Sequence, residues 1–223
     1  MKIQGVVNNF LSSIRTSLQN NSQVGTDLNA DNNGNLIVSE GHGRYYAPTY
    51  YGIGFSASTV PGTPVTLSAG LMANSTAYTG LVITNPFGNS FNFVLNKVGV
   101  GFVIAPANAA ALGVQVGYNT TTQIAQTTAI TTVGSNLVGS GLTSTALIAS
   151  SVTPAGSGNT FRVPVIFGDT GIAATSAIGI GTLLYDLEGS IILKPGSWAA
   201  IYSSALGGTS GTVASFSWEE VPV

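Results

Sequence analysis

The sequence predicts an all-β protein, an antiparallel β-sandwich of jelly-roll-like form, with an N-terminal arm or short helix. Short apolar runs recur along the chain, several with a period of two, and Gly, Pro or Asn separate them. The length supports the same prediction, because 223 residues suit one β-domain with an appended arm, although two small domains would also fit. We therefore expect an arm or linker at 1–46 and a β-sandwich at 47–223.

The first segment differs from the rest of the chain. Its apolar residues follow helical spacing, at Val6 or Val7, Phe10, Ile14 and Leu18, with polar residues between them. This pattern predicts a short amphipathic helix, or an arm that docks on a neighbouring chain through Phe10 and Ile14. A frayed terminus is the alternative, because terminal residues are disordered unless something holds them.

Residues 29–40 match part of the spacing of a calcium loop. Oxygen-bearing side chains fall at ligand positions and a glutamate closes the stretch, at Asn29, Asp31, Asn33 and Glu40. However, Asn29 stands where a carboxylate is expected, and the glycines at 41 and 43 begin an exit helix poorly. A tight turn at Asn33 and Gly34 that leads into a strand is therefore the favoured interpretation. We predict no metal and no cofactor.

Four tyrosines follow within seven residues, at Tyr45, Tyr46, Tyr50 and Tyr51. A tyrosine offers an apolar face and a hydroxyl, which suits both protein contacts and the stacking of a sugar. A sugar site also needs several carboxylates or amides, and only Glu40 and Arg44 are charged nearby. We favour a protein interface over a glycan platform, and a packed connection between arm and domain is the third interpretation.

The β-domain is expected to begin after this cluster. Its strands are predicted at 52–58, 63–69, Tyr78–Thr84, 91–95, 98–104 and 114–118. The region 107–158 is rich in small residues, so 125–130 and 142–148 are either strands or loops, and 153–160 is a loop. A strand at 161–167 must lie at a sheet edge or carry a bulge, because Pro164 cannot donate a ladder hydrogen bond. Shorter runs at 183–187 and 191–193 complete the set.

The last stretch, 189–223, contains both tryptophans of the chain and is predicted to close the core as a hairpin. Its two strands cover 198–202 and 213–218, and a glycine-rich loop separates them. In the second strand Ala214, Phe216 and Trp218 alternate with polar residues, which predicts that these three side chains face the core.

Charge and composition exclude several classes of protein. Only 6% of the residues are charged and the net charge is −2, so there is no basic footprint for nucleic acid. No run approaches the length of a membrane span or the core of a signal peptide, so we also predict no membrane partner. A charge-poor surface is typical of a chain that packs against other chains. A surface-protein composition without an export signal fits a virus particle, which assembles in the cytoplasm.

Catalytic constellations are sparse, and we predict that the chain is not an enzyme. The chain has no cysteine, and its one histidine, His42, stands in a glycine-rich turn without a serine nucleophile motif. Asp186 and Glu188 lie two apart and could face one side of a strand, as in a glycosidase. A solvated strand edge is the favoured interpretation of this pair, and a solvent or interface pair is expected at Glu219 and Glu220.

Four short motifs stand out together: 31–38 (DNNGNLIV), 81–86 (LVITNP), Pro195 with Gly196, and 217–222 (SWEEVP). In these motifs the sequence resembles small virion proteins of tailed bacteriophages. The resemblance spans most of the chain, except for the low-complexity middle. It implies a jelly-roll-like domain in a phage particle, as a head decoration or cement protein that works as a trimer.

The leading hypothesis is therefore a virion structural protein that stabilises the head by binding the capsid lattice. Its expected partners are further copies of itself and the major capsid protein or another virion protein. The alternative is a tail fibre, spike or adhesin-type module that binds a host glycan or protein through the tyrosine cluster. A glycan hydrolase acting through Asp186 and Glu188 comes third.

Overall fold

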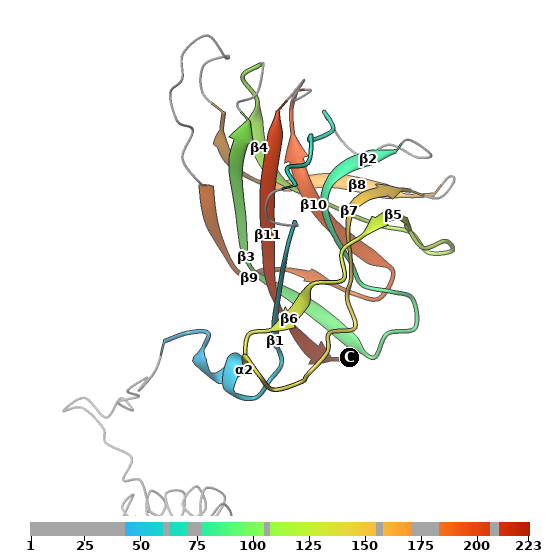
Figure 1. The fold of residues 1–223 in the computed structure, drawn as a ribbon. Coiled ribbons are helices and arrows are strands. Elements are labelled where there is room, and N and C mark those ends of the chain that lie inside the picture. The colour runs from blue at the N-terminus through green and yellow to red at the C-terminus, as the bar shows by residue number, and fades with distance from the viewer. Residues whose placement is uncertain are drawn as a thin grey trace, which may run out of the picture. The chain divides into compact units, whose positions relative to one another are not determined.

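The computed structural model describes residues 43–59, 63–70, 77–104, 108–154, 158–170, 183–205 and 210–223. The chain divides into two compact units, Met1–Gly43 and Arg44–Val223, and the second contains nearly all the described residues. Two antiparallel sheets and a short helix make up this second unit, so the all-β sandwich prediction is confirmed (Figure 1). Residues 1–42 of the predicted arm, which include Phe10 and Ile14, lie outside the described residues, and the arm stays a prediction.

One sheet has five strands and the other has six. The five-stranded sheet runs in the order β6 (Val133–Ser135), β1 (Gly54–Ser58), β11 (Gly211–Pro222), β3 (Phe91–Ile104) and β9 (Leu183–Leu193). The six-stranded sheet runs in the order β5 (Ala125–Ala129), β7 (Leu147–Thr153), β2 (Tyr78–Thr84), β10 (Ser197–Ser203), β4 (Ala111–Tyr118) and β8 (Thr160–Asp169). The helix α2 covers Tyr46–Tyr50 and precedes β1.

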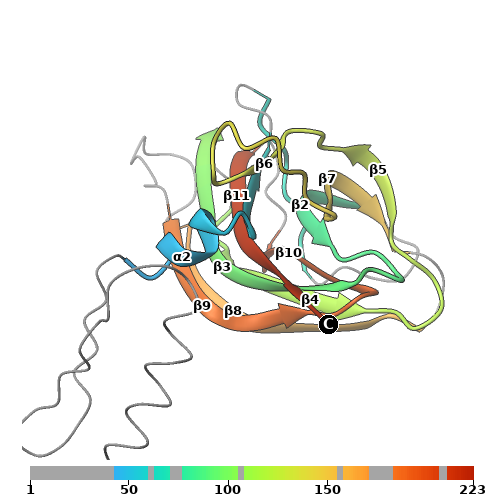
Figure 2. The same cartoon turned by 90° about the horizontal axis from the view of Figure 1, so that it is seen from below.

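Eight of the strands have the arrangement of a jelly roll. Without β5, β6 and β7, a sheet ordered β1-β11-β3-β9 faces a sheet ordered β2-β10-β4-β8. The three other strands are inserted between β4 and β8 along the chain. They extend both sheets on one side, because β6 pairs with β1 while β7 pairs with β2 (Figure 2). The opposite side is left with β8 and β9 as edge strands.

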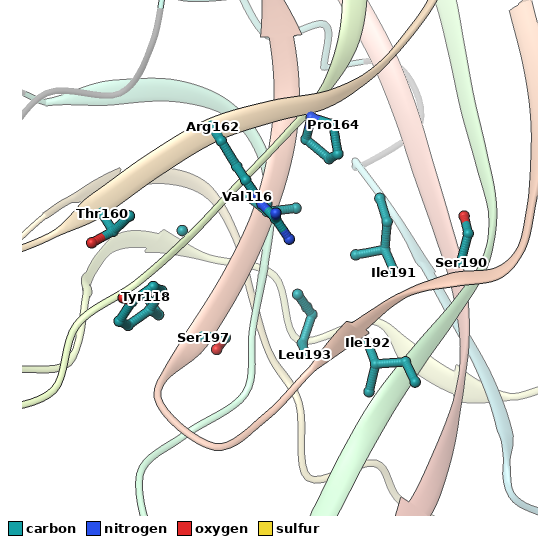
Figure 3. A pocket seen from close by; sticks show the side chains of 11 residues that line it. Val116, Tyr118, Thr160, Arg162, Pro164, Ser190, Ile191, Ile192, Leu193 and Ser197 are labelled. Carbon is teal, nitrogen blue, oxygen red and sulfur yellow. The ribbon is translucent and has the colours of Figure 1, made fainter.

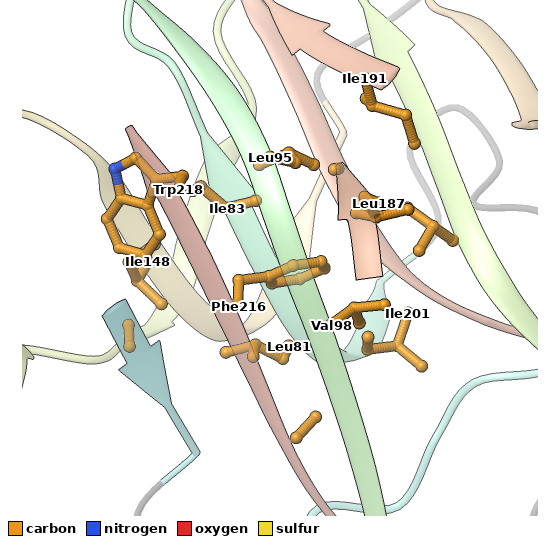
Figure 4. Packing of buried hydrophobic residues seen from close by; sticks show 14 of the residues in the cluster. Leu81, Ile83, Leu95, Val98, Ile148, Leu187, Ile191, Ile201, Phe216 and Trp218 are labelled. Atoms are coloured by element: carbon orange, nitrogen blue, oxygen red, sulfur yellow. The ribbon is translucent and has the colours of Figure 1, made fainter. Parts of the chain in front are cut away.

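The main core lies between the two sheets (Figure 4). Phe216 and Trp218 of β11 are buried against residues of the facing sheet, which include Leu81, Ile83, Ile148 and Ile201. Their polar neighbours Ser215 and Ser217 are partly exposed. The alternation predicted for this strand is therefore confirmed.

A second, smaller cluster covers the other face of the six-stranded sheet. Trp198 is its largest member and packs against Phe161 with ring centroids 5.5 Å apart. The predicted hairpin of the two tryptophans is wrong, because β10 pairs with β2 and β4 whereas β11 pairs with β1 and β3. Trp198 and Ala200 lie on the outer face of β10, whereas Ala199 and Ile201 face the main core together with Trp218, so each tryptophan fills a different apolar cluster.

Several predicted strand limits also differ from the structure. The runs 91–95 and 98–104 form a single strand, β3, whose pairing continues across a bulge. The runs 183–187 and 191–193 likewise form β9, which is interrupted where Glu188 and Gly189 adopt positive φ. The expected strand 63–69 contributes only a single bridge, from Val65 to Thr212. A bulge breaks the period-two pattern without ending the pairing, and this is why sequence periodicity divided these strands.

Candidate functional site

The helix α2 presents a row of exposed tyrosines. Tyr51 N donates a hydrogen bond to Ala47 O at 2.9 Å, Pro48 fits in the first turn, and Gly52 ends the helix at φ 72°. The rings of Tyr46 and Tyr50 stack with centroids 5.7 Å apart, and Tyr51 meets Tyr50 edge-on. Tyr50 is 62% exposed and Tyr51 is 74% exposed, so these rings pack on each other and still face outwards.

A loop with exposed aliphatic side chains lies beside the end of this helix. Asn136 N donates to Gly54 O at 2.9 Å, and the side chain of Leu142 lies against Gly52. The same loop exposes three aliphatic side chains, and Val138 among them is 93% exposed. We call these six side chains the tyrosine patch: Tyr46, Tyr50, Tyr51, Leu137, Val138 and Leu142. The patch contains no charged side chain.

Tyr45 takes a different role from the other tyrosines. Its hydroxyl donates a hydrogen bond to Asp186 Oδ1, and Lys97 Nζ lies 4.6 Å from the centroid of its ring. The adjacent Arg44 forms an ion pair of 2.8 Å with Glu188. These contacts join the start of the domain to β3 and β9, and we call them the latch. The structure thus separates Tyr45 from the interface candidates Tyr46, Tyr50 and Tyr51.

The latch also accounts for the two carboxylates that the glycosidase hypothesis used. The hydrogen bond from Tyr45 lowers the pKa of Asp186, with smaller contributions from the Glu188 backbone N–H and nearby cations. A general acid of a glycosidase needs a raised pKa instead. Asp186 and Glu188 bind residues 44 and 45, and neither lines the pocket described next.

A pocket of about 380 Å³ lies between the edge strands of the two sheets (Figure 3). The end of β4 and the starts of β8 and β10, which lie in one sheet, form one wall, and residues 190–193 of β9 form the other. The apolar part of its lining consists of Val116, Pro164, Ile191, Ile192 and Leu193. Hydroxyl groups come from Tyr118, Thr160, Ser190 and Ser197.

Arg162 is the one charged residue among the side chains that line this pocket. Its orientation follows from the register of β8 on β4. Val114 pairs with Val165, but Val116 pairs with Arg162, so β8 contains one extra residue in this interval. Directly paired residues share a face of the sheet, and Val116 faces the space between the sheets. The bulge therefore turns Arg162 to the inner face, and its side chain extends towards Ile191 and Leu193 (Figure 3).

Sequence reasoning missed Arg162 and Tyr118 as candidate site residues. It predicted that the strand around Pro164 lies at a sheet edge or carries a bulge, and β8 does both. That signal locates the irregularity but cannot indicate which residue it turns inwards. The calcium candidates Asn29, Asp31, Asn33 and Glu40, together with His42, lie outside the described residues.

Within the described ranges, no group of three or more His, Cys, Asp or Glu side chains is placed to hold a metal ion. Over the same ranges, no helix has the length and apolar character needed to cross a membrane. Comparisons with models of protein families, with curated proteins and with solved structures give no match to this chain.

Proposed function

We propose that this chain is a structural protein of a tailed-phage virion, a decoration or cement protein that stabilises the head by binding the capsid lattice as a trimer. The motif resemblance supports the phage assignment, and the tyrosine patch is the observation that carries the interaction. The jelly-roll fold recurs in viral capsid proteins as well as in lectins, and we use it here as a fold-level analogy.

The tyrosine patch has the composition of a protein contact surface. Tyrosine is enriched at interfaces, because it buries a large area while it fixes few rotatable bonds. Stacking of Tyr46 on Tyr50 already restricts these side chains, so less conformational entropy is lost when a partner binds. The adjacent Leu137, Val138 and Leu142 enlarge the apolar area that a partner would cover.

The alternative, a module that binds a host glycan through the tyrosines, finds less support in this patch. A glycan site needs polar groups that fix the orientation of the sugar. The six side chains of the patch provide tyrosine hydroxyls but no carboxylate, amide or cation. Arg44, Lys97, Asp186 and Glu188 contact one another or Tyr45 within the latch.

Binding to capsid shells that lack the protein tests the proposal, together with light scattering of the free protein. We expect a trimer that binds the shells and raises their resistance to heat. The double variant Tyr50→Ser with Tyr51→Ser should fail to form the trimer or to bind the shells. Tyr118→Ser is the matched control, because it removes a half-exposed tyrosine that is not part of the patch. Normal assembly and normal shell binding by the double variant would contradict the proposal.

A further inference from the structure

We propose that the pocket between β8 and β9 binds a small sugar that carries a carboxylate, and that Arg162 holds the carboxylate. This site is distinct from the tyrosine patch and does not depend on the capsid-binding proposal. Three features of the pocket support it: the placement of Arg162, the absence of a competing acid in the lining, and the mixture of hydroxyl and apolar groups.

The first feature is an exposed cation that lines a concave site. The bulge in β8 directs Arg162 to the face that it shares with Val116, between the edges of the two sheets. An arginine that points away from the sheets would offer a small ligand no second wall to contact. Here Ile191 and Leu193 of β9 form that second wall. The volume of about 380 Å³ lies at the small end of the range for ligand pockets.

The second feature is the charge of the lining. Arg162 is its only charged side chain, so no carboxylate of the pocket neutralises the guanidinium. The exposed Lys194 directly follows Leu193 and adds positive potential beside the site. A guanidinium presents two parallel N–H groups that match the two oxygens of a carboxylate. The electrostatics therefore favour an anion, and the shape of the donor group favours a carboxylate.

The third feature separates a sugar from a simple anion or a fatty acid. Thr160, Ser190 and Ser197 supply hydroxyls that can both donate and accept hydrogen bonds, as sugar hydroxyls require. Tyr118 is 48% exposed and offers an aromatic face for the C–H side of a sugar ring. A fatty acid would leave these hydroxyls without partners. A phosphate is usually held by several cations or a row of backbone N–H groups, whereas one cation lines this pocket.

Saturation-transfer NMR and calorimetry with the full chain test this inference. The probes are glucuronic acid and N-acetylneuraminic acid, with glucose, acetate and inorganic phosphate for comparison. We expect at least one acidic sugar to bind, and Arg162→Gln to weaken that binding by about 10-fold or more, since a charge-assisted hydrogen-bond pair is lost. Arg44→Gln makes the same charge change in the latch, so it should leave the affinity unchanged.

Several results would overturn the inference. If glucose binds with the same affinity as the acidic sugars, the carboxylate has no role in recognition. If acetate or phosphate binds with that affinity, the pocket is an anion site without selectivity for a sugar. Unchanged affinity in Arg162→Gln would locate the binding elsewhere, and no binding of either acidic sugar would reject the site. Tyr50→Ser with Tyr51→Ser should retain sugar binding, so failure of this inference and failure of the capsid-binding proposal can be told apart.

Discussion

Thr145 and Glu220 are joined by two kinds of hydrogen bond: Thr145 N donates to Oε1 at 3.0 Å, and Thr145 Oγ1 donates to Oε2 at 2.9 Å. Ser144 Oγ also donates to this carboxylate, and Trp218 Nε1 approaches it at 3.4 Å. Glu220 is only 4% exposed, so its expected role in a solvent or interface pair is wrong. It faces the same side of β11 as Trp218, where the loop after β6 brings it donors. The carboxylate thus anchors the loop that supplies part of the tyrosine patch.

Replacing Glu220 with Gln should lower the free energy of unfolding by about 2 to 3 kcal/mol. The donors on Ser144 and Thr145 would lose a charged acceptor, and the new amide NH₂ group would point at one of these donors. Urea unfolding followed by tryptophan fluorescence measures the change. Glu219→Gln is the matched control, since Glu219 is partly exposed and accepts a hydrogen bond from Asn96 at 2.8 Å. This control should lower the free energy of unfolding by less than about 1 kcal/mol. Equal losses of stability in the two variants would refute this role for Glu220.

Gly117→Ala should destabilise the domain by about 1 to 3 kcal/mol through overpacking. An added Cβ would lie 2.3 Å from the buried Trp198 ring and 2.5 Å from Thr160 O, so the ring and the backbone of β8 would have to shift. Gly134→Ala is the control, because a Cβ at that position would meet no atom within 4 Å. Thermal melting should separate the two variants clearly. A tolerated Gly117→Ala would show that Trp198 is less tightly packed against β4 than described.

The latch should make stability depend on pH at the acidic end. The folded-state pKa of Asp186 is lowered from its ordinary value of 3.8, chiefly because Tyr45 donates a hydrogen bond to it. The folded state therefore binds the proton less readily than the unfolded state. The stabilisation from Asp186 is present above pH 3.8 and is lost as the pH falls towards the lower folded-state value.

Melting temperatures of the native protein and of Asp186→Asn, measured from about pH 7 to about pH 3, test this expectation. The native protein should melt higher near neutral pH, and the difference should shrink towards zero in acid. Tyr45→Phe removes the donor and should show the same convergence. A difference that stays constant across this range would exclude the titration of Asp186 as its source.

Tyr78→Phe should lower the free energy of unfolding by about 1 kcal/mol. The substitution removes the buried hydroxyl, which donates a hydrogen bond to Ile201 O, and leaves the ring in place. Burial also raises the pKa of Tyr78, so the hydroxyl remains protonated in the folded state. Tyr202→Phe, on a half-buried residue of β10, is the comparison and should change stability less. Chemical denaturation measures both, and a larger effect at Tyr202 would contradict this ranking.

The sequence by itself determined the class of the fold and the inward side of its last strand. The alternation at Ala214, Phe216 and Trp218 indicates which side chains are buried, and Pro164 lacks a backbone N–H for a ladder hydrogen bond. Both are local properties of the chain. It also located the tyrosines, although it could not separate Tyr45 from the other three.

Tertiary structure alone decided which distant residues meet. Arg162 enters the pocket because one extra residue in β8 changes its face relative to Val116, and periodicity cannot reveal where the partner strand places that residue. Glu220 is buried because a loop about 75 residues earlier in the chain supplies its donors. Trp198 and Trp218 occupy separate clusters because Trp198 lies on the outer face of β10, whereas Trp218 faces the space between the sheets. Strand pairing and the packing of one sheet on the other depend on contacts between distant segments. These contacts form only when the whole sandwich is assembled.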